Sequence, residues 1–263
     1  MTMPPALRAV RKKRFAWPWA LAGLVALSLG AAVYCRHLGY PDGPVYRFLP
    51  AQSGAMARGD GTVALFFSGD MGFNTGMAPQ IAGKIAEQGV PVLGVNSLAA
   101  FSRRRTPEDV RALVENAARR ALALAGARRV ALIGQSFGAN ILLEGVRHLP
   151  PDLRAHIGLV ALVVPGDRML FRATPGGLFD FSDDGPALAV ARHIGWTRVL
   201  CIHGQEESHS LCPQWRQSNV RSLALPGGHF LNEDIPLISA TLSRAIAEQG
   251  AALSVSSSKA VPK

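Results

Sequence analysis

A serine placed between two glycines carries the strongest chemical signal in this sequence. Ser136 lies in the turn from Gly134 to Gly138, where an apolar run leads into the first glycine and a helical pattern follows the second. A nucleophile elbow needs this strand, tight turn and helix, because side chains at the glycine positions would clash with the strand and the helix. The pattern predicts a serine nucleophile at a helix amino terminus, which favours developing negative charge. A glycine-flanked helix cap is the competing interpretation.

A serine hydroxyl needs a general base and an acid that orients this base, in the chain order serine, acid, histidine. His229 stands in a glycine-rich loop after an apolar run, and we expect it to be the base. Glu206 and Glu207 follow the preceding apolar run. We favour Glu207 as the acid, with Glu206 as the alternative. His203 lies ahead of both and is expected to pack at the end of a strand. This chemistry calls for neither a metal ion nor a cofactor.

The tetrahedral intermediate of acyl transfer needs two backbone donors, one after the nucleophile and one in the loop after an earlier strand. Phe137 supplies the first amide. Residues 68–73 follow an apolar run and contain two glycines. We expect the second amide to come from Asp70 or Met71 in that loop.

Apolar runs alternate with helical patterns in the sequence that surrounds these residues. Strands are predicted at 63–67, 90–95, 130–133, 157–164, 199–202 and 220–225, and helices at 77–88, 107–124, 137–148 and 233–248. Short apolar strands separated by helices are typical of a mostly parallel sheet covered on both faces. The fold class is therefore α/β, and the motifs favour an α/β-hydrolase fold.

The amino-terminal part of the sequence predicts export. A basic arm at 1–14 precedes residues 15–34, twenty residues without a charge. A helix of that length crosses a bilayer, and its basic flank stays in the cytoplasm. Segment 15–35 is expected to be a transmembrane anchor or a cleaved signal peptide, because small residues at 28–32 have the spacing that signal peptidase needs. We favour the anchor.

The other predicted boundaries follow from composition. Residues 36–60 are rich in glycine, proline and small polar residues and are expected to form a linker before the hydrolase domain at 61–250. Residues 165–193 have no sustained period and are predicted to be a lid-like insertion. Residues 251–263 lack a large apolar face and are predicted to be disordered.

The net charge of +10 does not point to nucleic acid. The five basic residues before the apolar run and two tail lysines account for seven of these charges, so the folded part is nearly balanced.

The two cysteines of the exported part, Cys201 and Cys212, are expected to pair in an oxidising compartment and to enclose both candidate acids. Two unrelated buried thiols are the alternative.

Four motifs in order resemble the VirJ/AcvB family of bacterial virulence-associated proteins. They lie at 68–73, 134–140, 201–213 and 227–229, and the resemblance covers roughly residues 60–248. The resemblance implies an α/β-hydrolase fold, export to the periplasm and a link to type IV secretion. In AcvB-like members it also implies hydrolysis of aminoacylated phosphatidylglycerol, such as lysyl-phosphatidylglycerol.

The sequence thus favours a serine esterase of the periplasm, tethered to the inner membrane and acting on a membrane lipid ester. A lysyl ester carries ammonium groups, which need carboxylate partners when they are desolvated. The candidate partners are Asp70, Asp180, Asp183 and Asp184. Two other functions stay open at this point: a non-catalytic adaptor that binds secretion components, and a carboxylesterase or thioesterase for small acyl esters.

Overall fold

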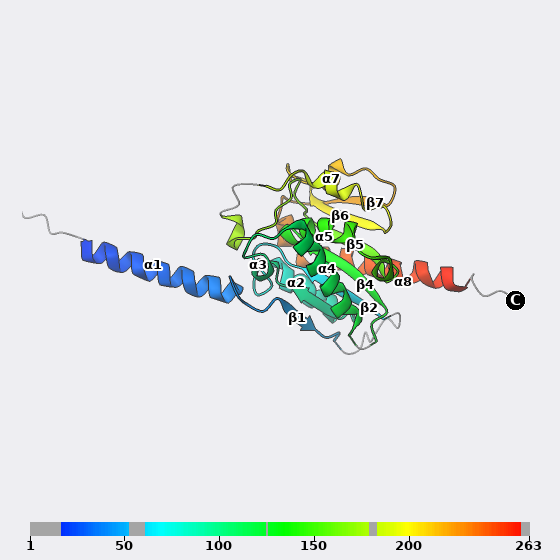
Figure 1. Ribbon diagram of the computed structural model, residues 1–263, viewed down its shortest axis with the longest axis horizontal. Coiled ribbons are helices and arrows are strands. Elements are labelled where there is room, and N and C mark those ends of the chain that lie inside the picture. Colours follow the sequence, from blue (N-terminus) through cyan, green and yellow to red (C-terminus); the bar gives the residue numbers. More distant parts are fainter. Residues whose placement is uncertain (1–16, 53–60, 125, 179–182, 259–263) are drawn as a thin grey trace, which may run out of the picture.

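The computed structural model describes residues 17–52, 61–124, 126–178 and 183–258 (Figure 1). The basic arm predicted at 1–14, the candidate Asp180 and the last five residues of the predicted tail lie outside the described residues.

A seven-stranded sheet forms the centre of the domain, in the order β1-β3-β2-β4-β5-β6-β7. Strand β1 pairs antiparallel with β3, and all other neighbours pair parallel. The strands are β1 (Tyr46–Leu49), β2 (Thr62–Phe67), β3 (Val92–Val95), β4 (Arg129–Gln135), β5 (Ile157–Val163), β6 (Val199–Gly204) and β7 (Val220–Leu225). The mostly parallel sheet that the sequence predicted is confirmed.

Helices cover both faces of this sheet, because its central strands bury side chains on both sides. On β2, Val63 and Leu65 belong to one apolar cluster, whereas Ala64 and Phe66 belong to the other. Helices α4, α5 and α7 complete the first cluster, and α2 and α8 complete the second. Their bounds are α2 (Met77–Glu87), α4 (Pro107–Leu122), α5 (Phe137–Arg147), α7 (Ala187–Ala191) and α8 (Ile235–Ser258). The predicted α/β class is therefore confirmed.

The remaining helical segments are short, with one exception. Helix α1 (Trp17–Leu38) extends from one end of the domain (Figure 1). Among the described residues it is long and apolar enough, by length and composition, to cross a membrane. The short segments are α3 (Ser97–Ala100), α6 (Pro151–Arg154) and the 3₁₀ turns η1 (Pro175–Gly177), η2 (Cys212–Gln214) and η3 (Leu231–Glu233).

The segment predicted to be a linker at 36–60 contains folded structure in its described part. Helix α1 continues to Leu38, and β1 follows after a short turn. Tyr46 pairs with Val95 and Leu49 with Val92, so β1 forms an edge of the sheet. A four-residue run containing a charge gives little sequence signal, and pairing with β3 defines the strand. The linker prediction is corrected here.

Two further boundaries also differ from the predictions. The irregular insertion at 165–193 contains α7, whose five residues are too few to show a helical period. Helix α8 continues to Ser258, where disorder was predicted from residue 251. Ala251, Ala252 and Leu253 are strong helix formers, and extending an existing helix avoids the cost of nucleation. The predicted disorder is corrected through Ser258.

Candidate active site

The backbone at Ser136 has the conformation that a nucleophile elbow requires. Strand β4 ends at Gln135 and α5 begins at Phe137, so the serine is the single residue between them. Its φ of 51° and ψ of −119° are unusual for a residue that is not glycine. Such a conformation costs on the order of 1–3 kcal/mol and persists only where the surroundings enforce it. The Ser136 amide donates to the carbonyl oxygen of Val163 at 2.8 Å, which holds the turn against β5.

The two flanking glycines are required by close backbone contacts. A methyl group at Gly134 would lie 2.6 Å from the Cα atom of Ala139 in α5. A methyl group at Gly138 would lie 2.3 Å from the carbonyl oxygen of Ser68. The first contact is the clash with the helix that the sequence predicted. The close approach of Gly138 to Ser68 packs the elbow directly against the loop that follows β2.

A continuous chain of hydrogen bonds joins Ser136, His229 and Glu207. The Ser136 Oγ atom lies 2.8 Å from His229 Nε2, and His229 Nδ1 lies 2.5 Å from Glu207 Oε1. With a neutral imidazole that is protonated on Nδ1, the ring donates to the carboxylate and accepts from the serine hydroxyl. The Glu207 side chain is only 6% exposed, whereas Glu206 is exposed. Of the two candidate acids, Glu207 is the one that reaches the histidine.

The acid loop and the histidine loop follow neighbouring strands and pack backbone to backbone. Glu207 follows β6 and His229 follows β7, so both lie at the carboxyl edge of the sheet. The Glu206 amide donates to the carbonyl oxygen of Gly227 at 3.1 Å. A methyl group at Gly204 would lie 2.2 Å from the carbonyl oxygen of Gly228. The distance between acid and base is therefore set by main-chain contacts.

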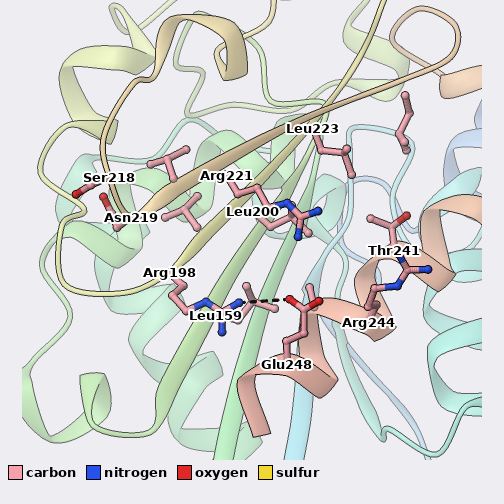
Figure 2. Close-up of a pocket in the computed structure, with 14 residues that line it drawn as sticks. Leu159, Arg198, Leu200, Ser218, Asn219, Arg221, Leu223, Thr241, Arg244 and Glu248 are labelled. Carbon is pink, nitrogen blue, oxygen red and sulfur yellow. Dashed lines mark hydrogen bonds and ion pairs between the residues drawn. The ribbon is translucent and has the colours of Figure 1, made fainter. Parts of the chain in front are cut away.

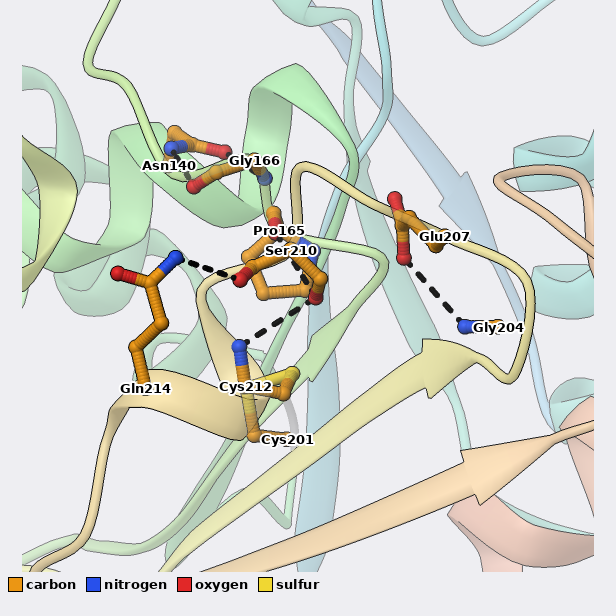
Figure 3. The surroundings of a disulfide bond; sticks show 9 residues. All are labelled: Asn140, Pro165, Gly166, Cys201, Gly204, Glu207, Ser210, Cys212 and Gln214. Carbon is orange, nitrogen blue, oxygen red and sulfur yellow. Dashed lines mark hydrogen bonds between the residues drawn. A yellow bond between two sulfur atoms is a disulfide. The ribbon is translucent and has the colours of Figure 1, made fainter.

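A disulfide closes the loop that carries Glu207 (Figure 3). Cys201 in β6 is bonded to Cys212 at the start of η2, with a Cα–Cα distance of 5.4 Å. The same loop is held to the end of β5, because the Leu211 amide donates to the carbonyl oxygen of Pro165 at 3.1 Å. The predicted pairing is confirmed, and the bond ties both ends of the acid loop to the sheet.

A cavity of about 440 Å³ opens beside Ser136. Its walls come from the loop after β2, the start of α2, the elbow and the histidine loop. Asp70 and Met71 line it, and a methyl group at the adjacent Gly69 would lie 3.5 Å from the Ser136 Cβ atom. Phe137 begins α5, so its amide lies in the first turn, where no intrahelical acceptor exists. The three amides predicted to bind an oxyanion thus belong to segments that meet at the nucleophile.

The aspartates predicted to bind a substrate ammonium group do not all lie at the cavity. Asp70 lines the cavity. Asp183 accepts from Arg168 at 2.6 Å, and this hydrogen bond lowers the pKa of the Asp183 carboxyl. Asp184 pairs with Arg104 and also accepts from the Phe171 amide. Asp183 and Asp184 therefore hold the irregular insertion together and do not line the cavity, which corrects their predicted role.

A second carboxylate of the cavity, Glu233, was missed by the sequence analysis. It ends the turn η3, in which Leu231, Asn232 and Glu233 have φ values of 48°, 53° and 54°. Three successive left-handed residues are rare because each brings its Cβ atom close to the backbone. The residues around His229 do not predict this turn from their sequence. It is this turn that brings Glu233 to the wall of the cavity.

A separate groove of about 420 Å³ lies under β6 and β7 beside α8 (Figure 2). Leu200 and Leu223 form part of its floor, and Arg198, which pairs with Glu248 at 3.5 Å, lies at its rim. The groove contains none of the residues that surround Ser136, so we place the candidate active site in the other cavity.

The arrangement around Ser136 has the parts needed for acyl transfer. The hydroxyl can pass its proton to His229 as it attacks a carbonyl carbon, and the buried Glu207 carboxylate can stabilise the resulting imidazolium. The Phe137 amide, one residue past the nucleophile, is available to an oxyanion because it lies in the first turn of α5, and a water molecule could complete hydrolysis.

The domain matches one known family and resembles solved structures. A family described as bacterial virulence protein (VirJ) matches residues 61–249. The protein Est1E from Butyrivibrio proteoclasticus is 14% identical, with a TM-score of 0.55 over 78% of this chain and 94% of Est1E. An α/β serine hydrolase without a lid from Xanthomonas campestris is 17% identical, with a TM-score of 0.51 over 79% and 90% of the two chains. No curated protein matches at a significant level. At these identities the structural matches establish an α/β-hydrolase fold.

Proposed function

The chain belongs to the VirJ family of bacterial virulence proteins, and we propose that it is a serine hydrolase of the exported compartment that cleaves a carboxylic ester. The observation that carries the proposal is the chain of hydrogen bonds from Ser136 through His229 to Glu207 at a strained elbow. The proposed substrate class is an aminoacylated phospholipid, such as lysyl-phosphatidylglycerol.

The proposed reaction proceeds through an acyl-enzyme. Ser136 Oγ attacks the ester carbonyl while His229 Nε2 takes the hydroxyl proton. The oxyanion accepts hydrogen bonds from the Phe137 amide and from amides of the loop at Asp70 and Met71. The alcohol leaves with the proton from His229, and the aminoacyl group stays on the serine. Water then attacks, again with His229 as base, and releases the amino acid and the free serine.

Glu207 is proposed to orient the imidazole during both steps. Its Oε1 atom contacts His229, and its Oε2 atom accepts from the Gly204 amide at 3.4 Å. A carboxylate that is 6% exposed loses most of its hydration, so it is held by its remaining polar partners. Its position fixes which ring nitrogen carries the proton in the resting state.

Two acidic residues of the cavity support a lysyl headgroup as the substrate. Asp70, in the loop after β2, and Glu233, in the turn that follows the histidine loop, both line the cavity. A lysyl ester carries two ammonium groups, and pairing them with carboxylates offsets the cost of removing them from water. This negative cavity supports an aminoacyl ester over an ester with an anionic acyl group.

The proposed location is the periplasm, with α1 as the tether to the inner membrane. Helix α1 exposes its apolar side chains along its length, including Trp19, Leu24 and Val33. A basic flank favours retention of the amino terminus in the cytoplasm. The disulfide between Cys201 and Cys212 supports an oxidising compartment for the domain.

The test compares the full-length protein with Ser136→Ala. Bacterial membranes that contain lysyl-phosphatidylglycerol are extracted after expression of each, and thin-layer chromatography measures the aminoacylated and free lipid. We expect the wild type to deplete the lysyl lipid and Ser136→Ala to leave it intact, with equal amounts of folded protein. His229→Ala is expected to behave like Ser136→Ala.

Each other result excludes part of the proposal. An unchanged lysyl lipid, together with hydrolysis of short acyl esters by the wild type, would indicate a general carboxylesterase or thioesterase. No hydrolysis of either substrate by the folded wild type would favour a non-catalytic adaptor for type IV secretion components.

A further inference from the structure

The membrane helix ends directly on the candidate active site's own loop. Leu38, the last residue of α1, is fully buried, and its carbonyl oxygen accepts from Asn96 Nδ2 at 3.2 Å. A methyl group at Gly72 would lie 3.0 Å from that same oxygen. Asn74 Nδ2 also donates to the His37 carbonyl oxygen at 2.9 Å. The end of α1 is therefore packed between the segments that follow β2 and β3.

These contacts place the end of α1 at the carboxyl edge of the parallel strands, where Ser136 lies. Asn96 and Gly72 follow the carboxyl ends of parallel strands, and Ser136 follows β4 at the same edge. Met71, the neighbour of Gly72, lines the cavity beside Ser136. One loop thus contacts the end of the membrane helix on one side and the cavity on the other.

Two large apolar side chains are exposed at this edge although they are not part of α1. Phe230, next to His229, lines the cavity and is 63% exposed. Leu178 follows η1 and is 70% exposed. Gly176 of η1 lines the same cavity, and a methyl group on it would lie 3.7 Å from Met71 Sδ. In Figure 1 the yellow-green turn η1 lies at the end of the domain from which α1 extends.

We propose that Leu178 and Phe230 form a membrane-docking rim, which inserts into the leaflet on the exported side of the membrane that α1 crosses. The cavity then opens at the level of the lipid headgroups and receives the ester from the bilayer. This inference rests on the proposed function, because it assigns the substrate to the membrane surface. Two apolar side chains bind a bilayer weakly on their own. Because α1 holds the domain at the surface, weak insertion is enough.

Insertion is measured directly with a fluorophore. In a Cys35→Ser background, Leu178→Cys is labelled with an environment-sensitive dye, and the full-length chain is reconstituted in vesicles of phosphatidylethanolamine and phosphatidylglycerol. Brominated lipids then quench dyes that enter the acyl region. The matched control is Ser218→Cys, an exposed residue just before β7, at the opposite edge of the sheet (Figure 2).

The expected result is a blue shift and strong quenching at position 178, with neither at position 218. Equal emission and equal quenching at the two positions would overturn the docking rim. Because this readout needs no catalysis, it tests docking even if the lipid proves not to be the substrate.

Activity gives the second readout. Leu178→Ser removes an apolar side chain that does not line the cavity, so hydrolysis of a soluble short acyl ester is expected to stay unchanged. Hydrolysis of the lipid ester in vesicles is expected to fall roughly five- to tenfold, because less apolar surface is buried in the bilayer. Phe48→Ser is the matched control: it removes a side chain of 49% exposure from β1, where Phe48 pairs with Leu93 away from the carboxyl edge.

The outcomes separate the two proposals. A loss confined to the lipid ester and to Leu178→Ser supports the rim. An equal loss on both esters, or an equal loss in Phe48→Ser, overturns it. A wild type that cleaves the soluble ester but not the lipid contradicts the proposed substrate, whatever the fluorophore shows.

Discussion

Gly204 offers a direct test of how the acid and the base are held together. It ends β6, and a methyl group there would lie 2.2 Å and 2.4 Å from the carbonyl oxygens of Gly228 and Gly227. A carbon and an oxygen that are not bonded need about 3.3 Å. Gly204→Ala must therefore move the histidine loop by roughly 1 Å relative to β6.

This displacement is large enough to break the hydrogen bond between His229 and Ser136. His229 Nε2 lies 2.8 Å from Ser136 Oγ, and a shift of about 1 Å takes the pair beyond hydrogen-bond distance. A misplacement of that size costs on the order of 10²-fold in rate. We expect kcat on a soluble ester to fall about a hundredfold with a nearly unchanged KM, because the change affects proton transfer more than substrate binding.

Gly228→Ala is the matched control. A methyl group at Gly228 meets no atom within 4 Å, although Gly228 is the direct neighbour of His229. Its kcat is expected to stay within about twofold of the wild type. Thermal unfolding measured by circular dichroism checks that both variants are folded at the assay temperature. Wild-type activity in a folded Gly204→Ala, or an equal loss in the two variants, would refute the reasoning.

Three further predictions concern the residues around the site. Glu207→Gln is expected to lower kcat far more than Glu206→Gln, since the Glu207 carboxylate is hydrogen-bonded to His229 whereas Glu206 is exposed; the opposite ranking in steady-state kinetics would move the acid to Glu206. Cys201→Ser with Cys212→Ser should lower the free energy of unfolding by about 3 kcal/mol, from the entropy of an open loop of this length, and an unchanged urea midpoint would contradict that role. Asp70→Asn is expected to lower kcat/KM for a lysyl ester more than for an alanyl ester, whereas equal losses would indicate a structural aspartate.

Several features of the fold follow from local sequence and were predictable. The elbow at Ser136 was predictable because its glycines lie within two residues of the serine, and the clash that Gly134 avoids, with Ala139 of α5, is local in the sequence. The parallel strands are continuous apolar runs, since both of their faces are buried. The pairing of Cys201 with Cys212 followed from the compartment and from the small number of cysteines.

Other features depend on contacts between distant segments, and the sequence did not predict them. Strand β1 exists because it pairs with β3, and its own residues carry little strand signal. Asp183 and Asp184 were candidates for binding substrate until the fold paired them with arginines. Glu233 reaches the cavity through three left-handed residues, whose strain the surrounding structure compensates.

The sequence by itself determined the candidate nucleophile, the candidate base and the order of the elements that present them, because those depend on steric rules and on hydrophobic periods within short segments. Only the tertiary structure decided that Glu207, and not Glu206, meets the imidazole, since adjacent residues of one loop differ in direction and not in type. It also decided that α1 ends on the loop beside Ser136, because residues 38 and 72 are brought together by the β1–β3–β2 edge of the sheet.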